Sequence, residues 1–418
     1  MPSEYSNTQV YLGLACLLFY YLLCGVLVTD IGGYEAALIH NYNFNAVVIS
    51  LLASALWAGI VLGGIITAIV IDIYGSGKVT IASATLTFIG SCLFYYTKSA
   101  VTMEAAQFII GLGISSIFCL IQKVLPQNFP KNRLALLTGI NQCVYSIGSC
   151  IAITGFIDLI ALVGLEDTKG IVAILCGINV VLQLLVYRIN DDKNHKSAVP
   201  LKVALFKMLS VLENKKLVLV VLCSALIGGF TSIFLGLWAI PYLDAVLHEP
   251  TLIKTAISLC FIVCSVGTLL FGIIYYKFFT PLYWLFLQCI CVFIGYSCLL
   301  YIPQKSLEVW MIMFLLFLCS FSVGCNLTWT SAYLESLFPT NLYIYSSALY
   351  CSLYRLFLSL ITPIIGLKLY YFSKTTTNYS SISDYQSSFL FLVFMFGVSV
   401  LVSIYLIMRE KTEKFNGG

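Results

Sequence analysis

Long apolar runs, separated by short polar segments, extend through the whole sequence. A helix that crosses a membrane needs about 20 apolar residues, and the chain contains twelve runs of this kind. We predict twelve membrane-spanning helices, at about 10–29, 46–71, 79–97, 104–125, 134–163, 170–187, 217–242, 255–276, 282–301, 309–336, 344–371 and 389–408. Because the number of spans is even, both termini are expected on the same side of the membrane.

Lysine and arginine are unevenly distributed between the two sets of loops. Fifteen fall on the side that holds both termini and five on the other, including Lys98, Lys169 and Lys254. Arg355 remains inside the membrane, and Lys368 lies near the outer end of span eleven. Because cytoplasmic loops carry the excess of basic residues, we predict that both termini are cytoplasmic.

The longest polar segment separates two halves of six spans each. It ends in an amphipathic stretch from Val203, which we expect to lie along the inner membrane surface. We predict an all-α integral membrane protein with an N-terminal six-helix bundle over 1–187, a cytoplasmic linker over 188–216 and a C-terminal six-helix bundle over 217–418. Two six-span halves of this kind are typical of parallel repeats in transporters.

Composition supports the membrane assignment. The chain is 60% apolar and 10% charged, with a mean hydropathy of +0.98, and a soluble core could not bury that much apolar surface. The net charge of +4 is spread out, so nothing indicates nucleic acid. Most of the sixteen cysteines lie inside apolar runs and the three histidines fall in predicted loops. No metal-ligand spacing results, and we predict no metal and no cofactor.

A short polar motif follows the second span. In the stretch Asp72-Ile-Tyr-Gly75-Ser-Gly-Lys78, an acid, a glycine and a lysine are spaced as in a known signature. The stretch resembles the Gly-x-x-x-Asp-Arg-x-Gly-Arg-Lys motif between helices 2 and 3 of the major facilitator superfamily of transporters. Ala68 stands at the first glycine and Ile73 at the first arginine. The resemblance implies that Asp72, Gly75 and Lys78 form a conformational latch at the cytoplasmic side.

Three further stretches resemble one bacterial branch of organic-solute permeases in this superfamily. They are Gly236-Leu-Trp238-Ala-Ile-Pro241-Tyr-Leu in span seven, Tyr333-Leu-Glu335-Ser-Leu-Phe-Pro339 after span ten and Ser383-Asp384-Tyr385-Gln386 before the last span. The superfamily resemblance extends from end to end and implies the twelve-helix fold, alternating access and usually proton coupling. It also implies a multi-pass protein of the bacterial inner membrane.

Four charged residues lie at predicted membrane depth, where a charge is costly and has a functional or pairing role. Arg355 lies near the middle of span eleven, and its planar guanidinium matches a carboxylate. We predict that it binds an anionic group of the substrate. Proton coupling needs a membrane acid, and the candidates are Glu335 first, then Asp158 in span five and Asp30 at the end of span one. The competing interpretation is that these acids reach water at the membrane surfaces.

Polar side chains recur at helical spacing in two spans. These predicted substrate-binding residues are Asn326, Trp329, Thr330 and Tyr333 in span ten, and Asn141, Gln142 and Tyr145 in span five. Because a polar group inside a membrane needs a partner, the pattern indicates a cavity shared with Arg355. Hydrogen bonds that hold the helices of a bundle together would give the same pattern.

These features predict a secondary active transporter for a small polar organic solute, driven by protons. A carboxylate-bearing metabolite, such as an amino acid or organic acid, is the leading substrate. The sequence lacks a P-loop, because Gly75-Ser-Gly-Lys78 does not have the required spacing. The expected partners are the solute, a proton or another coupling ion and the lipid bilayer, and we expect a monomer.

Other functions remain open at this point. The same fold would suit a transport-derived membrane sensor, a sugar or sugar-phosphate transporter, or a drug transporter. A membrane enzyme is disfavoured because the outer loops contain no cluster of acids or histidines.

Overall fold

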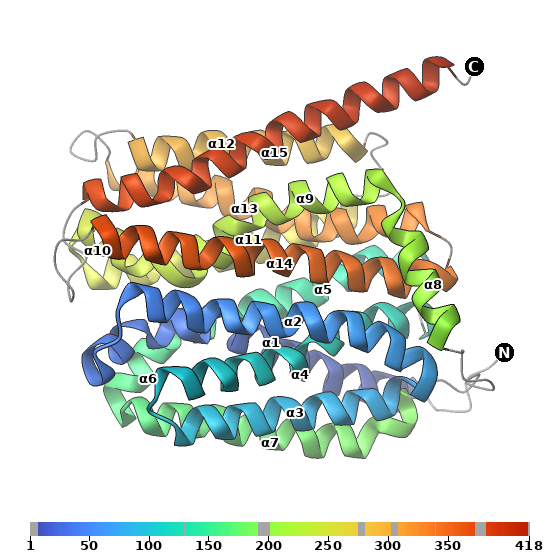
Figure 1. The fold of residues 1–418 in the computed structure, drawn as a ribbon, viewed down its shortest axis with the longest axis horizontal. Helices are drawn as coiled ribbons and strands as arrows, with labels where there is room; N and C mark the ends of the chain where they lie inside the picture. The colour runs from blue at the N-terminus through green and yellow to red at the C-terminus, as the bar shows by residue number, and fades with distance from the viewer. Residues whose placement is uncertain are drawn as a thin grey trace.

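The structure is a computed structural model that describes residues 7–128, 131–190, 201–274, 281–301, 308–338, 340–372 and 382–416. In these ranges the chain is almost entirely helical, and the long helices run side by side (Figure 1). The elements are α1 (Asn7–Tyr42), α2 (Ala46–Tyr74), α3 (Ser76–Tyr96), α4 (Ala100–Asn128), α5 (Lys131–Cys150), η1 (Ile151–Gly155), α6 (Phe156–Val163), α7 (Leu165–Asn190), α8 (Leu201–Leu212), α9 (Lys215–Gly229), η2 (Phe230–Trp238), α10 (Ala239–Leu247), α11 (Pro250–Ile274), α12 (Pro281–Tyr301), α13 (Val309–Leu337), α14 (Thr340–Phe372) and α15 (Ile382–Asn416).

The predicted fold class is confirmed. Twelve helical segments among the described residues are long and apolar enough to cross a membrane, and they occur in the order predicted. Span five consists of α5, η1 and α6, and span seven of α9, η2 and α10. The segments η1 and η2 are π-helical, a rare geometry that is frequently found at functional sites.

The first span departs from its predicted limits. The prediction ended it at Asp30, but α1 continues to Tyr42. Asp30 and Glu35 are only 2% and 4% exposed, so the protein interior encloses both acids. The predicted end was wrong because hydropathy treats a buried acid as a boundary, although helix packing can enclose it.

The spans form two six-helix bundles that meet mainly along two helix pairs. In the first half, α4 packs against α2 and α3, and α7 packs against α3 and α1. In the second half, α13 packs against α11 and α12, and α15 packs against α12 and α9. Contacts of α2 with α14 and of α5 with α11 join the halves. The residue limits of the bundles stay a prediction, because 191–200 lies outside the described residues.

The two ends of the molecule carry different short helices. The start of α1 and the end of α15 lie at the same end of the molecule as α8, here called the α8 end, whereas α6 and α10 lie at the opposite end, called the α10 end (Figure 1). Helix α8 buries Val211 and exposes Val203, Phe206 and Leu209. This exposed apolar face suits a helix on a membrane surface, and the cytoplasmic orientation of the α8 end stays a prediction.

Candidate functional site

A small cavity lies between the two bundles, beside the middle of α14. Side chains from α1, α4 and α5 of the first half and from η2, α13 and α14 of the second half line it. Its volume is about 60 Å³, whereas pockets for small molecules usually measure about 300–1,000 Å³. Helices or side chains must therefore move before a metabolite fits.

Arg355 is the cation among the described residues that line this cavity. Its side chain is buried, and its Cζ lies 5.1 Å from the ring centre of Trp57, 5.2 Å from that of Phe118 and 4.7 Å from that of Tyr354. Its Nε atom has no hydrogen-bond partner, and no ion pair joins Arg355 to an acid within the described part of the chain. Cation–π contacts stabilise the guanidinium, but they leave its charge available to an anion.

The polar face of α5 lies on the cavity. Asn141, Gln142 and Tyr145 all line it together with Arg355, so the structure brings these four predicted residues together. Asn141 is buried, and its side-chain nitrogen makes no hydrogen bond to any described residue. This face therefore presents amide and hydroxyl groups that a bound solute could use.

The polar face of α13 points elsewhere. Asn326 donates a hydrogen bond of 3.0 Å from Nδ2 to Oε1 of Gln288 on α12. The hydroxyl oxygens of Thr330 and Ser224 are 2.9 Å apart, which links α13 to α9. Neither Asn326 nor Thr330 lines the cavity, so the structure does not bring them together with Arg355. Their partners belong to helices of the same bundle.

The two aromatic residues predicted on α13 are also away from the cavity. The rings of Trp329 and Tyr333 stack on each other, with centres 5.0 Å apart and planes 11° from parallel, and neither residue lines the cavity. Helix α13 instead presents Leu327 and Ser331 there. These two cavity-lining residues of α13 are each one position away from a predicted residue, Leu327 from Asn326 and Ser331 from Thr330.

Aromatic side chains in the cavity were missed from the sequence. Tyr21 and Phe118 line it, and their ring centres are 5.5 Å apart. An aromatic residue inside an apolar run gives no distinctive signal. The α14 residues Ser347, Tyr350 and Tyr354 also line the cavity, and their helical spacing ahead of Arg355 is a signal that could have identified them.

The three predicted proton-coupling acids occupy separate places. Asp30 is buried in the first bundle, where Nε2 of Gln107 donates to its carboxylate at 3.3 and 3.4 Å. Asp158 is largely exposed and forms an ion pair with Lys254, which joins α6 to α11 at the α10 end. The backbone of Glu335 belongs to α13, but its side chain lies outside the described residues.

A second, larger cavity of about 740 Å³ lies at the α10 end. It is lined by the buried Glu35, which was not among the predicted site residues, and by Gly32. A Cβ atom on Gly32 would lie 2.2 Å from the carbonyl oxygen of Gly236, so only glycine allows α1 and η2 to approach this closely. Along α1, this contact lies between Tyr21 at the small cavity and Glu35 at the large one.

Asp72 connects the two halves at the α8 end. The hydroxyl of Tyr345 on α14 donates to its Oδ2 at 2.7 Å, and Nζ of Lys207 on α8 lies 3.8 Å from the same oxygen. Gly75 adopts a φ of 89° between α2 and α3, a conformation that favours glycine. Lys78 is exposed at the start of α3. Asp72 thus links α2 to Tyr345 on α14 and to Lys207 on α8, and its role as a latch stays a prediction.

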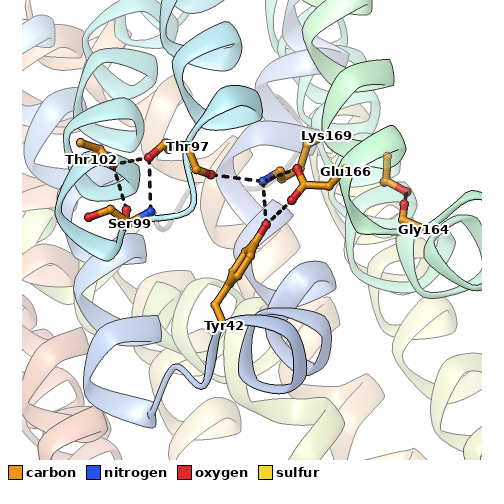
Figure 2. A network of polar contacts seen from close by, with 8 residues as sticks. Tyr42, Thr97, Ser99, Thr102, Gly164, Glu166 and Lys169 are labelled. Atoms are coloured by element: carbon orange, nitrogen blue, oxygen red, sulfur yellow. Dashed lines mark hydrogen bonds and ion pairs between the residues drawn. The ribbon is translucent and has the colours of Figure 1, made fainter.

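Lys169 differs most from its predicted surroundings. The sequence places it among the basic residues of the outer loops, but its side chain is fully buried at the start of α7. Its Nζ lies 3.0 Å from Oε2 of Glu166, 3.3 Å from the Tyr42 hydroxyl and 3.5 Å from the Thr97 carbonyl oxygen, and Figure 2 draws these contacts as dashed lines. The network ties α1, α7 and the turn after α3 together. The loop position was wrong because α7 begins at Leu165, before the predicted boundary.

Comparisons with known proteins agree with this architecture. A family model described as Major Facilitator Superfamily matches residues 13–360. The crystal structure of a mutant of the nucleoside transporter NupG is similar, with a TM-score of 0.69 and 14% sequence identity over 94% of this chain and 99% of that chain. At this identity the likeness shows the fold alone. No curated protein matches the sequence.

Proposed function

Because the chain belongs to the major facilitator superfamily, we propose that it is a secondary transporter that moves a small polar organic solute by alternating access. The observation that carries this proposal is the buried Arg355 in a cavity shared by both bundles. A cation at this depth is costly unless it serves binding or pairing. Rocking of one bundle against the other would expose the cavity to each side in turn.

The favoured solute carries a carboxylate or a comparable anionic group. The guanidinium fork of Arg355 suits a carboxylate in two-point contact, and the surrounding rings fix its position. Asn141, Gln142 and Tyr145 would bind the remaining polar groups of a metabolite such as an amino acid or organic acid. Among the described residues that line the cavity, Arg355 is the single cation, which disfavours a solute with several phosphate groups.

A nucleoside is the second candidate. NupG, which shares the fold, is named as a nucleoside transporter, and Tyr21, Phe118 and Tyr145 line the cavity with aromatic rings. A flat base would stack on such rings. A nucleoside would use Arg355 only through neutral oxygen atoms.

Proton coupling and the latch belong to the same proposal. Asp30 is a buried acid beside a neutral amide, which suits a group that alternates between protonated and ionised forms. Glu335 remains a candidate by its position on α13, and Asp158 is less suited because it is exposed and paired with Lys254. Asp72 would hold the α8 end closed until the bundles rock.

We also infer a monomer in the bacterial inner membrane, with cytoplasmic termini.

Counterflow in proteoliposomes tests the function. Vesicles are loaded with one unlabelled solute at a time from a panel of amino acids, organic acids, nucleosides, sugars and sugar phosphates, and entry of the same labelled solute is measured. We expect exchange of a carboxylate-bearing solute. Exchange of nucleosides alone would support the second candidate, and exchange of no solute would favour a sensor. An imposed pH gradient that leaves accumulation unchanged would contradict proton coupling.

A further inference from the structure

A groove on the outside of the first bundle is open to the membrane. Helix α4 packs closely against both α2 and α3, whereas α2 and α3 make few contacts with each other. The groove measures about 390 Å³, with Leu112 of α4 in its lining. Ile66 and Leu86, on its two sides, are 46% and 41% exposed. In a membrane protein, an apolar groove with this exposure faces acyl chains.

Lys78 lies at one end of this groove. It is exposed and belongs to the groove lining at the α8 end of α3. The motif that contains it predicted a latch, but Asp72 binds Tyr345 and Lys207, so Lys78 is not needed for that contact. A lysine at the end of a span lies at the depth of the lipid headgroups and attracts anionic lipids.

We propose that this groove binds one anionic phospholipid, with an acyl chain between α2 and α3 and the phosphate beside Lys78. The apolar lining alone would accept any lipid tail, and the lysine at one end adds selection for negative charge. The first turn of α3 lies at the same place, and the positive end of its dipole also favours a phosphate. The proposal requires only a membrane-embedded chain and does not depend on the transported solute.

Native mass spectrometry of the purified full chain tests this inference. The protein is titrated in detergent with phosphatidylglycerol or with phosphatidylcholine of the same acyl chains. Lys78→Gln removes the charge, Lys78→Arg keeps it, and Ala82→Trp fills the groove from an exposed lining position. Lys215→Gln is the matched control, since Lys215 is exposed at the start of α9 and does not line the groove.

We expect one phosphatidylglycerol to bind about five-fold more tightly to the wild type than to Lys78→Gln. Lys78→Arg and Lys215→Gln should match the wild type, and Ala82→Trp should lose binding of both lipids at an unchanged melting temperature. If the wild type and Lys78→Gln bind phosphatidylglycerol equally tightly, the proposal is overturned. If Ala82→Trp proves unstable, this comparison of the wild type with Lys78→Gln decides the question without it. Competition by soluble glycerol phosphate would also overturn it, because it would indicate a phosphate site without a lipid tail.

Discussion

Helices α5 and α13 carry the same pattern of polar residues but use it differently. On α5, Asn141, Gln142 and Tyr145 line the cavity that both bundles share. On α13, Asn326 and Thr330 form hydrogen bonds inside the second bundle. Helical spacing therefore identifies the side chains that share a face of a helix. The neighbouring helices then decide whether this face binds a solute or holds a bundle together.

The largest effect on transport should follow from a change at Arg355, which lines the cavity together with the polar face of α5. Arg355→Lys keeps the charge but loses the planar fork, so we expect solute affinity to fall about 10- to 100-fold, as loss of a charged hydrogen bond implies. The measurement is the KM for counterflow, together with the melting temperature. Normal transport by both Arg355→Lys and Arg355→Gln would show that the cavity does not bind the solute's anionic group.

The next largest effect concerns stability. Asn326→Ala removes the hydrogen bond to Gln288 and should lower the free energy of unfolding by about 1–2 kcal/mol, with solute affinity unchanged. Thermal unfolding in detergent measures the loss. Asn141→Ala is the matched variant on α5, and it should weaken binding while the melting temperature stays constant. If Asn326→Ala and Asn141→Ala weaken solute binding equally, the two polar faces do not differ in function.

A smaller effect is expected at Gln142. Its side chain lines the cavity, so Gln142→Ala should raise the KM about three- to five-fold, in keeping with one lost neutral hydrogen bond. Gln183 is the control, because its Nε2 donates at 3.0 Å both to the Cys16 carbonyl oxygen and to Asn179 inside the first bundle. Gln183→Ala should lower the melting temperature and leave KM unchanged. The reverse result would assign the solute to another cavity.

The sequence predicted the spans better than the site, for a physical reason. Twenty apolar residues suffice to cross a membrane, so hydropathy finds each span without its neighbours. The rotation of a helix about its axis depends on contacts far apart in the chain, such as Asn326 with Gln288 or Asp72 with Tyr345. Arg355 was identifiable because its charge at membrane depth is a local property.

The same reason explains the misplaced charges. Asp30 and Lys169 are polar in the sequence, and hydropathy therefore places both at helix ends. In the structure, Gln107 donates to Asp30, and Tyr42 and Glu166 surround Lys169. Gln107 and Tyr42 lie on other helices, and Glu166 lies in the first turn of α7, which hydropathy does not detect. The burial of Asp30 and Lys169 could therefore not be predicted from the residues next to them in the sequence.

The smallest effects are expected at two neighbouring residues of α13, one of which lies inside the bundle and the other in the cavity. Thr330 bonds Ser224 inside the bundle, whereas Ser331 lines the cavity. Successive residues of a helix point about 100° apart, so the two hydroxyl groups face different surroundings. Thr330→Val should cost about 0.6 kcal/mol of stability without changing affinity.

Ser331→Ala should show the opposite behaviour. The hydroxyl of Ser331 donates to the Leu327 carbonyl oxygen of its own helix and so does not join α13 to another helix through this bond. We therefore expect Ser331→Ala to leave the melting temperature constant and to raise the KM about two-fold. Both variants are measured by counterflow and thermal unfolding in the same preparation. If Thr330→Val changes KM and Ser331→Ala does not, α13 is rotated in the transporting protein, and its polar face then binds the solute as the face of α5 does.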